Sequence, residues 1–206
     1  MTDTIDYFYS HVSPYAYLGH AAFLDMAARH GVTVRFRPVN LGEVFAETGG
    51  LPLGQRHPAR QQYRWLELQR WALKRGLPFN FKPAFFPAAP GLADCVAIAL
   101  IEAGKSPAAF GRLMLAGCWA EERNIADESF IREALSKLGE DTDALIAAAK
   151  SDPITAIYAQ NVKDAIALNA FGSPCFVRDG ESFWGQDRLD LLEDAIVSGR
   201  PGFRPL

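Results

Sequence analysis

Cysteine and histidine are scarce in this chain of 206 residues, which has three cysteines and four histidines. No two cysteines have the C-x-x-C spacing, and the histidines do not combine with them into a zinc-binding pattern. We therefore expect no metal site and no disulfide framework. Cys95 and Cys118 lie in apolar stretches and are expected to be small core residues. The third cysteine is Cys175, and the histidines are His11, His20, His30 and His57.

The chain also lacks a large net charge and a long apolar run. Its formal net charge is −3, so no basic surface for nucleic acid or for an anionic membrane is expected. No apolar run reaches the length that spans a bilayer, and residues 1–6 lack the basic start and apolar stretch of a signal peptide. With 49% hydrophobic residues, the chain is expected to be a cytoplasmic protein with a substantial core.

An aromatic-rich stretch, residues 5–18, organises the rest of the chain. It begins as a strand and turns at Ser13-Pro14 into a helix that is expected to run to about His30. The turn places the Ser13 hydroxyl at a helix N-terminus, where unpaired N–H groups and the helix dipole stabilise an anion. The alternative is simple capping, since serine is a good N-cap and proline suits the first helical position. Ser-Pro also occurs at 106–107 and 173–174.

The predicted elements begin in the order β-α-β. Residues 32–38 alternate with period two, so they are expected to form a strand parallel to the first. A loop or short irregular helix over 41–58 and a long helix over about 59–75 follow. An aromatic segment over 79–90 is expected to be a core flap or the wall of an apolar pocket. Further helices are expected at about 92–103, 106–122, 128–138 and 142–150.

The last part of the chain is predicted as α-β-β-α. A helix that begins at Asp152-Pro153 precedes two short strands, which flank Asp179-Gly180, a dipeptide typical of a type I′ hairpin turn. The final helix is expected over about 186–198, with Asp187 as its cap. Without the helical block in the middle, this order is that of a thioredoxin-like fold. We therefore predict an α/β protein with a thioredoxin-like domain, residues 1–40 and 153–206, and an inserted all-helical domain, residues 41–152.

Four motifs together resemble one enzyme family. They are Ser13-Pro14-Tyr15-Ala16-Tyr17-Leu18, Phe36-Arg37-Pro38-Val39, Leu68-Gln69-Arg70-Trp71-Ala72 and Phe183-Trp184-Gly185-Gln186-Asp187-Arg188-Leu189-Asp190-Leu191-Leu192. Over essentially its whole length the chain resembles the 2-hydroxychromene-2-carboxylate isomerases, which are related to the kappa-class glutathione transferases and, more distantly, to the DsbA oxidoreductases. A disulfide oxidase of the DsbA type is not expected, because Ser13 and Ala16 stand where its two redox cysteines would be.

The resemblance implies glutathione as the cofactor. Ser13 then corresponds to the serine that hydrogen-bonds the glutathione sulfur and stabilises its thiolate, which makes it the predicted catalytic residue. Ser173 precedes Pro174, and this proline is typically cis in thioredoxin-like proteins. Ser173 is therefore expected to bond the backbone of the cysteinyl part of glutathione, opposite Ser13.

The resemblance also implies residues for the two ends of glutathione. Gln186 and Asp187 lie where the family holds the γ-glutamyl end, so its carboxylate and ammonium are expected there. Arg60 falls near the lysine that the kappa class uses against a glutathione carboxylate. His57, Arg60 and Arg64 are alternatively expected to bind the substrate carboxylate or to form a solvated face.

Three positions depart from the family pattern. Ser10 stands where many of the isomerases have an aspartate, and His11 stands where an aromatic residue is common. Gly50 falls about where the kappa class has an asparagine that reaches glutathione. The first two departures concern the shape of the pocket, and the third concerns the affinity for glutathione.

The function expected from the resemblance is glutathione-dependent cis-trans isomerisation of an aromatic-degradation intermediate. The reaction would convert 2-hydroxychromene-2-carboxylate to trans-o-hydroxybenzylidenepyruvate, or a similar pair, as the glutathione thiolate adds reversibly to a conjugated double bond. The alternatives are a kappa-class-like glutathione transferase or peroxidase acting on electrophiles, and a non-catalytic thioredoxin-like binding protein. The expected partners are a small aromatic carboxylate substrate and a second copy of the chain, because the family implies a homodimer.

Overall fold

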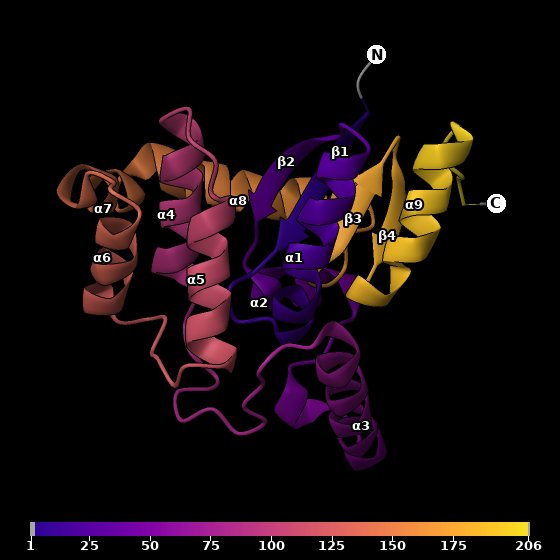
Figure 1. Cartoon of the computed structure of the whole chain (residues 1–206), viewed down its shortest axis with the longest axis horizontal. Helices are drawn as coiled ribbons and strands as arrows, with labels where there is room; N and C mark the ends of the chain where they lie inside the picture. The colour runs from indigo at the N-terminus through magenta and orange to yellow at the C-terminus, as the bar shows by residue number, and fades with distance from the viewer. Residues whose placement is uncertain (1–2, 206) are drawn as a thin grey trace.

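A four-stranded mixed sheet lies in the middle of the computed structural model, which describes residues 3–205 (Figure 1). The strands are β1 (Thr4–Tyr9), β2 (Thr33–Pro38), β3 (Cys175–Arg178) and β4 (Glu181–Trp184), in the order β2-β1-β3-β4. β2 runs parallel to β1, and β3 runs antiparallel to both β1 and β4. The predicted α/β class and thioredoxin-like order are therefore confirmed.

The described residues form nine α-helices and two short 3-10 helices. They are α1 (Pro14–Arg29), α2 (Leu41–Thr48), α3 (Pro58–Arg75), α4 (Gly91–Glu102), α5 (Ala108–Trp119), α6 (Glu128–Lys137), α7 (Thr142–Ala149), α8 (Asp152–Ala167), α9 (Leu189–Ser198), η1 (Leu53–Gln55) and η2 (Gln186–Arg188). The regular helix α2 stands where the sequence predicts a loop or short irregular helix, because the Asn40 side chain caps it by accepting from the Gly42 N–H at 3.0 Å. No described helix is both long and apolar enough to cross a membrane.

The two faces of the sheet carry different apolar side chains, because strand residues alternate. On one face Tyr7 and Phe176 contact Phe23 of α1 with tilted rings and belong to a core cluster that continues into α4–α7. On the other face Phe8 and Val177 form a second cluster with residues of α2 and α8. Figure 1 shows α1 and α8 on opposite sides of the sheet, with α4–α7 beside it. The inserted helices thus share a core with the sheet.

The predicted domain boundaries, 40/41 and 152/153, stay a prediction. Residues 1–2 and 206, which the prediction assigns to the thioredoxin-like domain, lie outside the described residues. The aromatic segment at 79–90 packs on Trp119, whose ring centroid lies 5.3 Å from that of Phe79 and 4.8 Å from that of Phe86. This corresponds to the core flap, one of the two roles predicted for the segment.

The hairpin turn is predicted correctly, whereas the cap of the last helix is not. Asp179 and Gly180 both have positive φ, +46° and +71°, as a type I′ turn requires. Asp187 does not cap a helix, because it lies inside η2, and α9 begins only at Leu189. Its carboxylate instead lies 2.8 Å from the Arg188 guanidinium.

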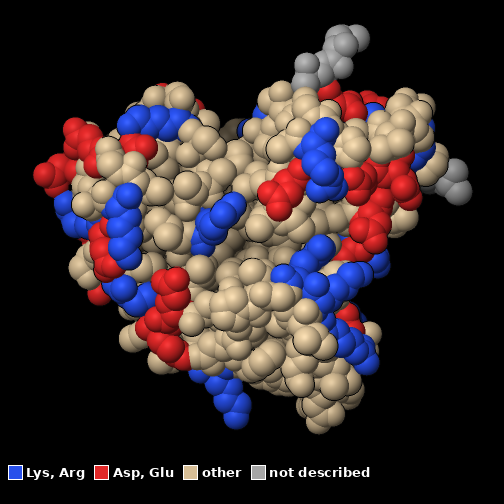
Figure 2. All heavy atoms as spheres, viewed as in Figure 1, with Lys and Arg blue, Asp and Glu red and all other residues tan. Residues whose placement is uncertain are grey.

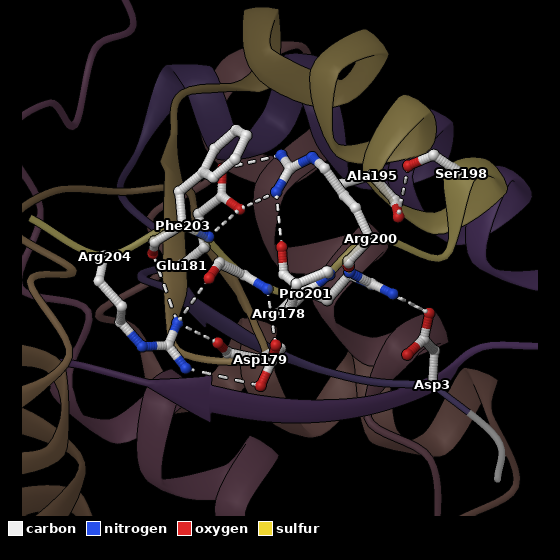
Figure 3. A network of polar contacts seen from close by, with 11 residues as sticks. Asp3, Arg178, Asp179, Glu181, Ala195, Ser198, Arg200, Pro201, Phe203 and Arg204 are labelled. Atoms are coloured by element: carbon white, nitrogen blue, oxygen red, sulfur yellow. Dashed lines mark hydrogen bonds and ion pairs between the residues drawn. The ribbon is translucent and has the colours of Figure 1, made fainter.

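The C-terminal tail is bound to the β3–β4 hairpin by a polar network (Figure 3). The Arg200 guanidinium contacts both carboxylate oxygens of Glu181, at 2.6 and 3.0 Å. The Gly202 N–H donates to the Asp179 carboxylate at 2.6 Å, and the buried Arg178 donates to the Arg200 carbonyl at 2.8 Å. The tail therefore holds the hairpin that follows Pro174.

Candidate functional site

Ser13 lies at the turn between β1 and α1 and is 4% exposed. It is the N-cap of α1, with its Oγ accepting from the Ala16 N–H at 3.2 Å. The same hydroxyl donates its proton to the Ser173 carbonyl at 2.9 Å. Ser13 therefore both caps the helix and contacts the segment before Pro174, so the capping interpretation and the site interpretation hold together.

The Ser173-Pro174 peptide bond is cis, as the sequence predicts. The Ser173 side chain accepts from the Ser10 N–H at 3.1 Å, and the Pro174 carbonyl accepts from the Gly185 N–H at 2.9 Å. Residues from the two ends of the chain are thereby brought together in front of the N-terminus of α1.

A cavity of about 580 Å³ adjoins this contact. Ser173 lines it, whereas Ser13 does not line it and contacts it only through its hydrogen bond to Ser173. One face of α3 forms another wall of the cavity. Its lining residues are three or four positions apart, the spacing that places side chains on the same face of a helix. The predicted Gln186 and Asp187 and the predicted Arg60 and Arg64 therefore line a single cavity. The α3 wall consists mainly of Arg60, Arg64, Glu67 and Trp71, and η2 contributes Gln186, Asp187 and Arg188.

Gln186 is 1% exposed and is fixed between α3 and α1. Its Oε1 accepts two bonds from the Arg75 guanidinium, at 3.1 and 2.9 Å. Its Nε2 has no partner within the described part of the chain. Gly19 of α1 permits this position, since a Cβ on Gly19 would lie 2.4 Å from the Gln186 Cβ.

The charges around the cavity are predominantly positive. Four arginines line it against two carboxylates, and Figure 2 shows basic side chains gathered where α3 meets the start of α9. Both carboxylates are already paired, Glu67 with Arg70 at 2.5 Å and Asp187 with Arg188 at 2.8 Å. The four cavity arginines are Arg56, Arg60, Arg64 and Arg188.

Arg64 is the buried member of this group, with 8% exposure. Across residues 3–205 its guanidinium has no ion-pair partner, and the rings of Trp65, Phe86 and Trp119 lie 5.6–6.0 Å away. Burial lowers its pKa below the usual range of arginine. The solvated face that the sequence allows is therefore wrong for Arg64.

The other two basic residues of the prediction are exposed. Arg60 lies on the cavity wall one turn before Arg64. His57 does not line this cavity: it caps α3, its Nδ1 accepting from the Ala59 N–H at 3.2 Å. His57 lines an adjoining hollow of about 350 Å³, which shares Arg56, Arg60 and Trp184 with the main cavity.

Four aromatic residues of the cavity are missing from the residues predicted for the site. They are Tyr15, Tyr63, Trp71 and Trp184. All except Tyr63 lie in motifs that carry the family resemblance, but only the fold shows that they line one cavity. Burial raises the pKa of Tyr15, so its hydroxyl keeps its proton at neutral pH.

A second group of residues missing from the prediction surrounds Asp94 of α4, which is fully buried. Ser10 donates its hydroxyl to Oδ2 at 3.0 Å, and Tyr158 of α8 donates to the same oxygen at 2.8 Å. The His11 N–H donates to Oδ1 at 3.1 Å, and the His11 Nδ1 lies 2.6 Å from it. Ser10 does not contact the imidazole, and all three side chains are buried, so this is not a hydrolytic triad.

Comparison with known proteins identifies the family and the fold of the chain. A family model described as a DsbA-like thioredoxin domain matches residues 4–197. The chain belongs to this family. A 2-hydroxychromene-2-carboxylate isomerase from Sphingobium xenophagum is 29% identical to it, over 96% of this chain and 100% of the relative. The glutathione S-transferase kappa 1 of Caenorhabditis elegans is 25% identical, over 96% and 92% respectively.

A solved structure of a 2-hydroxychromene-2-carboxylate isomerase superimposes on this DsbA-like chain with a TM-score of 0.81. The two are 27% identical, and the match covers 95% of each chain. The family resemblance expected from the sequence is therefore confirmed. The expected enzyme class, an isomerase related to the kappa transferases, agrees with the names of these relatives.

This DsbA-like chain has serine and alanine, Ser13 and Ala16, at the start of α1 where a redox pair would need two cysteines. The three cysteines are free and buried in the core. Burial raises the pKa of Cys95 to about 11 and those of Cys118 and Cys175 to about 12. Such thiols are poor nucleophiles at neutral pH, so thiol–disulfide exchange through them is not expected.

Proposed function

We propose that the protein is a glutathione-dependent isomerase of a small aromatic carboxylate, such as 2-hydroxychromene-2-carboxylate. The observation that carries the proposal is the contact between Ser13, at the N-terminus of α1, and Ser173, before a cis proline, at the edge of an aromatic and positively charged cavity. Its relatives include isomerases of this name and a kappa-class glutathione transferase, which supports both the cofactor and the reaction.

The cavity suits glutathione, which carries two carboxylates and one ammonium group. Ser173 would bond the middle of the tripeptide, since it lines the cavity and directly precedes the cis proline. Asp187 and Arg188 offer opposite charges for the γ-glutamyl end beside Gln186. The exposed Arg60 offers a cation for the glycyl carboxylate. Bound glutathione would supply the thiolate that adds reversibly to the conjugated double bond of the substrate.

The role of Ser13 is to stabilise that thiolate. The helix N-terminus favours a negative charge, and the hydroxyl adds a hydrogen-bond donor. The hydroxyl has one proton, which Ser173 accepts in this structure. To serve the sulfur it must turn away from the Ser173 carbonyl, which then accepts from the ligand backbone. No general base is needed, because the environment lowers the thiol pKa.

Arg64 is the residue that we assign to the carboxylate of the aromatic substrate. Arg64 is a largely buried residue of the cavity wall, its guanidinium is unpaired within the described residues, and Tyr15 and Trp71 line the same cavity. A planar, bidentate donor of this kind matches a carboxylate. His57 lies in the adjoining hollow, so we assign it no direct contact with the reacting double bond.

A kappa-class-like transferase or peroxidase is the second candidate, and the 25% identity to a kappa transferase favours it. It would use the same Ser13 and the same cofactor. Conjugation of glutathione to 1-chloro-2,4-dinitrobenzene without isomerase turnover would support the transferase. The cytoplasmic location and the homodimer stay predictions, and gel filtration with light scattering measures the second.

The test of the proposal is a titration with glutathione of the wild type and of Ser13→Ala. We expect the wild type to bind glutathione and to lower its thiol pKa, seen as thiolate ultraviolet absorbance near neutral pH. Ser13→Ala should lose about 1.5–3 kcal/mol of this stabilisation, as is usual for a hydrogen bond to a charged group. The corresponding change in thiolate formation and in rate is roughly 10- to 150-fold.

Ser106→Ala is a matched control, because Ser106 also precedes a proline at a helix start and its Oγ accepts from the Ala108 N–H at 3.4 Å. It should leave the thiol pKa unchanged. Absence of binding by the wild type at millimolar glutathione would refute the cofactor and the isomerase proposal together.

A further inference from the structure

Asp94 connects the inserted helices to the turn that carries Ser13. It belongs to α4, whereas Ser10 and His11, whose groups donate to its carboxyl oxygens, belong to the segment between β1 and α1. Tyr158 of α8 holds the same carboxyl group from a third element. All four contacts are 2.6–3.1 Å long. One buried carboxyl group therefore fixes three parts of the fold relative to one another.

The contacts continue from Ser10 to both sides of the candidate site. The Ser10 N–H donates to the Ser173 Oγ at 3.1 Å, and the Ser10 carbonyl accepts from the Ser13 N–H at 3.0 Å. The Ser13 hydroxyl closes the path by donating to the Ser173 carbonyl. Asp94 thus contacts neither the cavity nor the predicted cofactor, but one residue, Ser10, joins it to both serines of the site.

Ser10 and His11, at the turn before Ser13, both donate to the carboxyl group that α4 supplies. A serine at position 10 also allows the Ser10 hydroxyl to reach Asp94 while its N–H reaches Ser173.

We propose that Asp94 is a positioning residue for thiolate stabilisation by Ser13, acting through Ser10. The proposal rests on the proposed function of Ser13. Its physical basis is that a hydroxyl at a helix N-terminus stabilises an anion only in a narrow range of distance and angle. A turn held from one side only would let Ser13 and Ser173 move apart.

The first test measures the thiol pKa of glutathione bound to Asp94→Asn and to Ser10→Ala. Asparagine replaces one of the two acceptor oxygens of Asp94 by an NH2 group, so it cannot accept from both Ser10 and the His11 N–H. Alanine at position 10 removes the Ser10 hydroxyl, so the two changes disturb the connection from different sides. We expect each variant to weaken thiolate formation, by roughly 2- to 150-fold, the range found for residues of one hydrogen-bond network. In the Ser13→Ala background, Asp94→Asn should cause no further change.

Leu100→Ala is the control for lost stability, because Leu100 lies on the same helix, is 1% exposed and is absent from the network. It should destabilise the fold without changing the thiol pKa. The proposal is wrong if Asp94→Asn leaves the thiol pKa unchanged. It is equally wrong if Leu100→Ala shifts that pKa as much, or if the Asp94→Asn effect persists in full without Ser13.

The second test uses the protein without glutathione and so separates this proposal from the cofactor assignment. The Ser10 N–H and the Ala16 N–H report the two ends of the turn, because they donate to Ser173 and Ser13. Hydrogen exchange at these two amides should be faster in Asp94→Asn than in Leu100→Ala at equal global stability. Equal exchange in both variants would refute positioning by Asp94 even if glutathione binds.

Discussion

Arg64 is 8% exposed and lines the cavity without a counter-ion among the described residues, so its charge is only partly hydrated. Such a cation is expensive to bury, and an anionic ligand offsets that cost. We expect the wild type to bind 3-phenylpropanoate more tightly than its methyl ester. Arg64→Gln should lower the affinity for the acid roughly 10- to 150-fold and leave the ester unchanged. Calorimetry of both ligands on both proteins gives the comparison.

Two further variants separate charge from position at this site. Arg60→Gln, one turn earlier on the same wall and exposed, should keep the preference for the acid. Arg64→Met should unfold at a temperature no lower than the wild type, since it removes an unpaired buried charge and keeps contact with the neighbouring rings. Equal affinity of the wild type for acid and ester would count against Arg64 as the carboxylate site.

The close packing of α1 against η2 depends on the absence of a side chain at Gly19, so a substitution there tests this contact between the two elements. A Cβ at this position would lie 2.4 Å from the Gln186 Cβ, so Gly19→Ala forces the two elements apart. We expect a loss of about 1–3 kcal/mol in the free energy of unfolding, as for other overpacked sites. Urea denaturation measures it. Gly54→Ala is the control, because a Cβ there meets nothing within 4 Å.

Element by element, the sequence predicts most where the signal is local. The alternation at 32–38 and the Asp179-Gly180 turn lead directly to β2 and to the hairpin, because short-range backbone preferences decide both. Asp187 shows the opposite case: an aspartate before an apolar helix is a good cap, but η2 takes it into a 3-10 turn. Whether a residue caps a helix depends on the backbone conformation of that one residue, which the periodicity of the sequence does not indicate.

The residues of the candidate site likewise fall into those that the sequence could predict and those that it could not. Ser13, Ser173 and the residues of η2 could be predicted because motifs at both chain ends mark them. Asp94 could not, because it lies inside a uniformly apolar helix and all its partners are distant in sequence: Ser10 and His11 precede it by more than eighty residues, and Tyr158 follows it by 64. Only the packing of α4 beside β1 shows that its carboxyl group meets Ser10. Arg64 was predicted as a candidate, but its burial depends on Phe86 and Trp119, which belong to other segments.

Stability of the whole molecule should fall in mild acid because of His20. Its Nδ1 lies 3.3 Å from the Tyr7 hydroxyl and its Nε2 3.0 Å from the Ala108 carbonyl, and burial lowers its pKa from 6.5 to about 4. In the unfolded chain the His20 imidazole is therefore protonated below about pH 6.5, whereas in the folded chain it is protonated only below about pH 4. Between these values His20 should remove about 3 kcal/mol from the free energy of unfolding.

The measurement is urea denaturation at pH 7 and at several values down to pH 4, for the wild type and for His20→Gln. The difference in pH slope between the two isolates the contribution of His20 from that of the carboxylates. Parallel slopes would show that His20 takes up its proton at the same pH in the folded and unfolded protein, contrary to the pKa lowering expected from its burial.

The central strand β1 has its two partners at opposite ends of the gene product, and this has a consequence during synthesis. β2 is synthesised soon after β1 and can pair with it at once. The other edge of β1 has no partner until β3 is synthesised, and β3 begins only at Cys175. At a ribosomal rate of roughly 5–20 residues per second, the interval between Pro38 and Cys175 lasts about 7–27 s. Throughout it the nascent chain exposes an unpaired aromatic strand edge, a substrate for chaperones. A fragment that stops before Cys175 is therefore an aggregation hazard and not a weakly active enzyme.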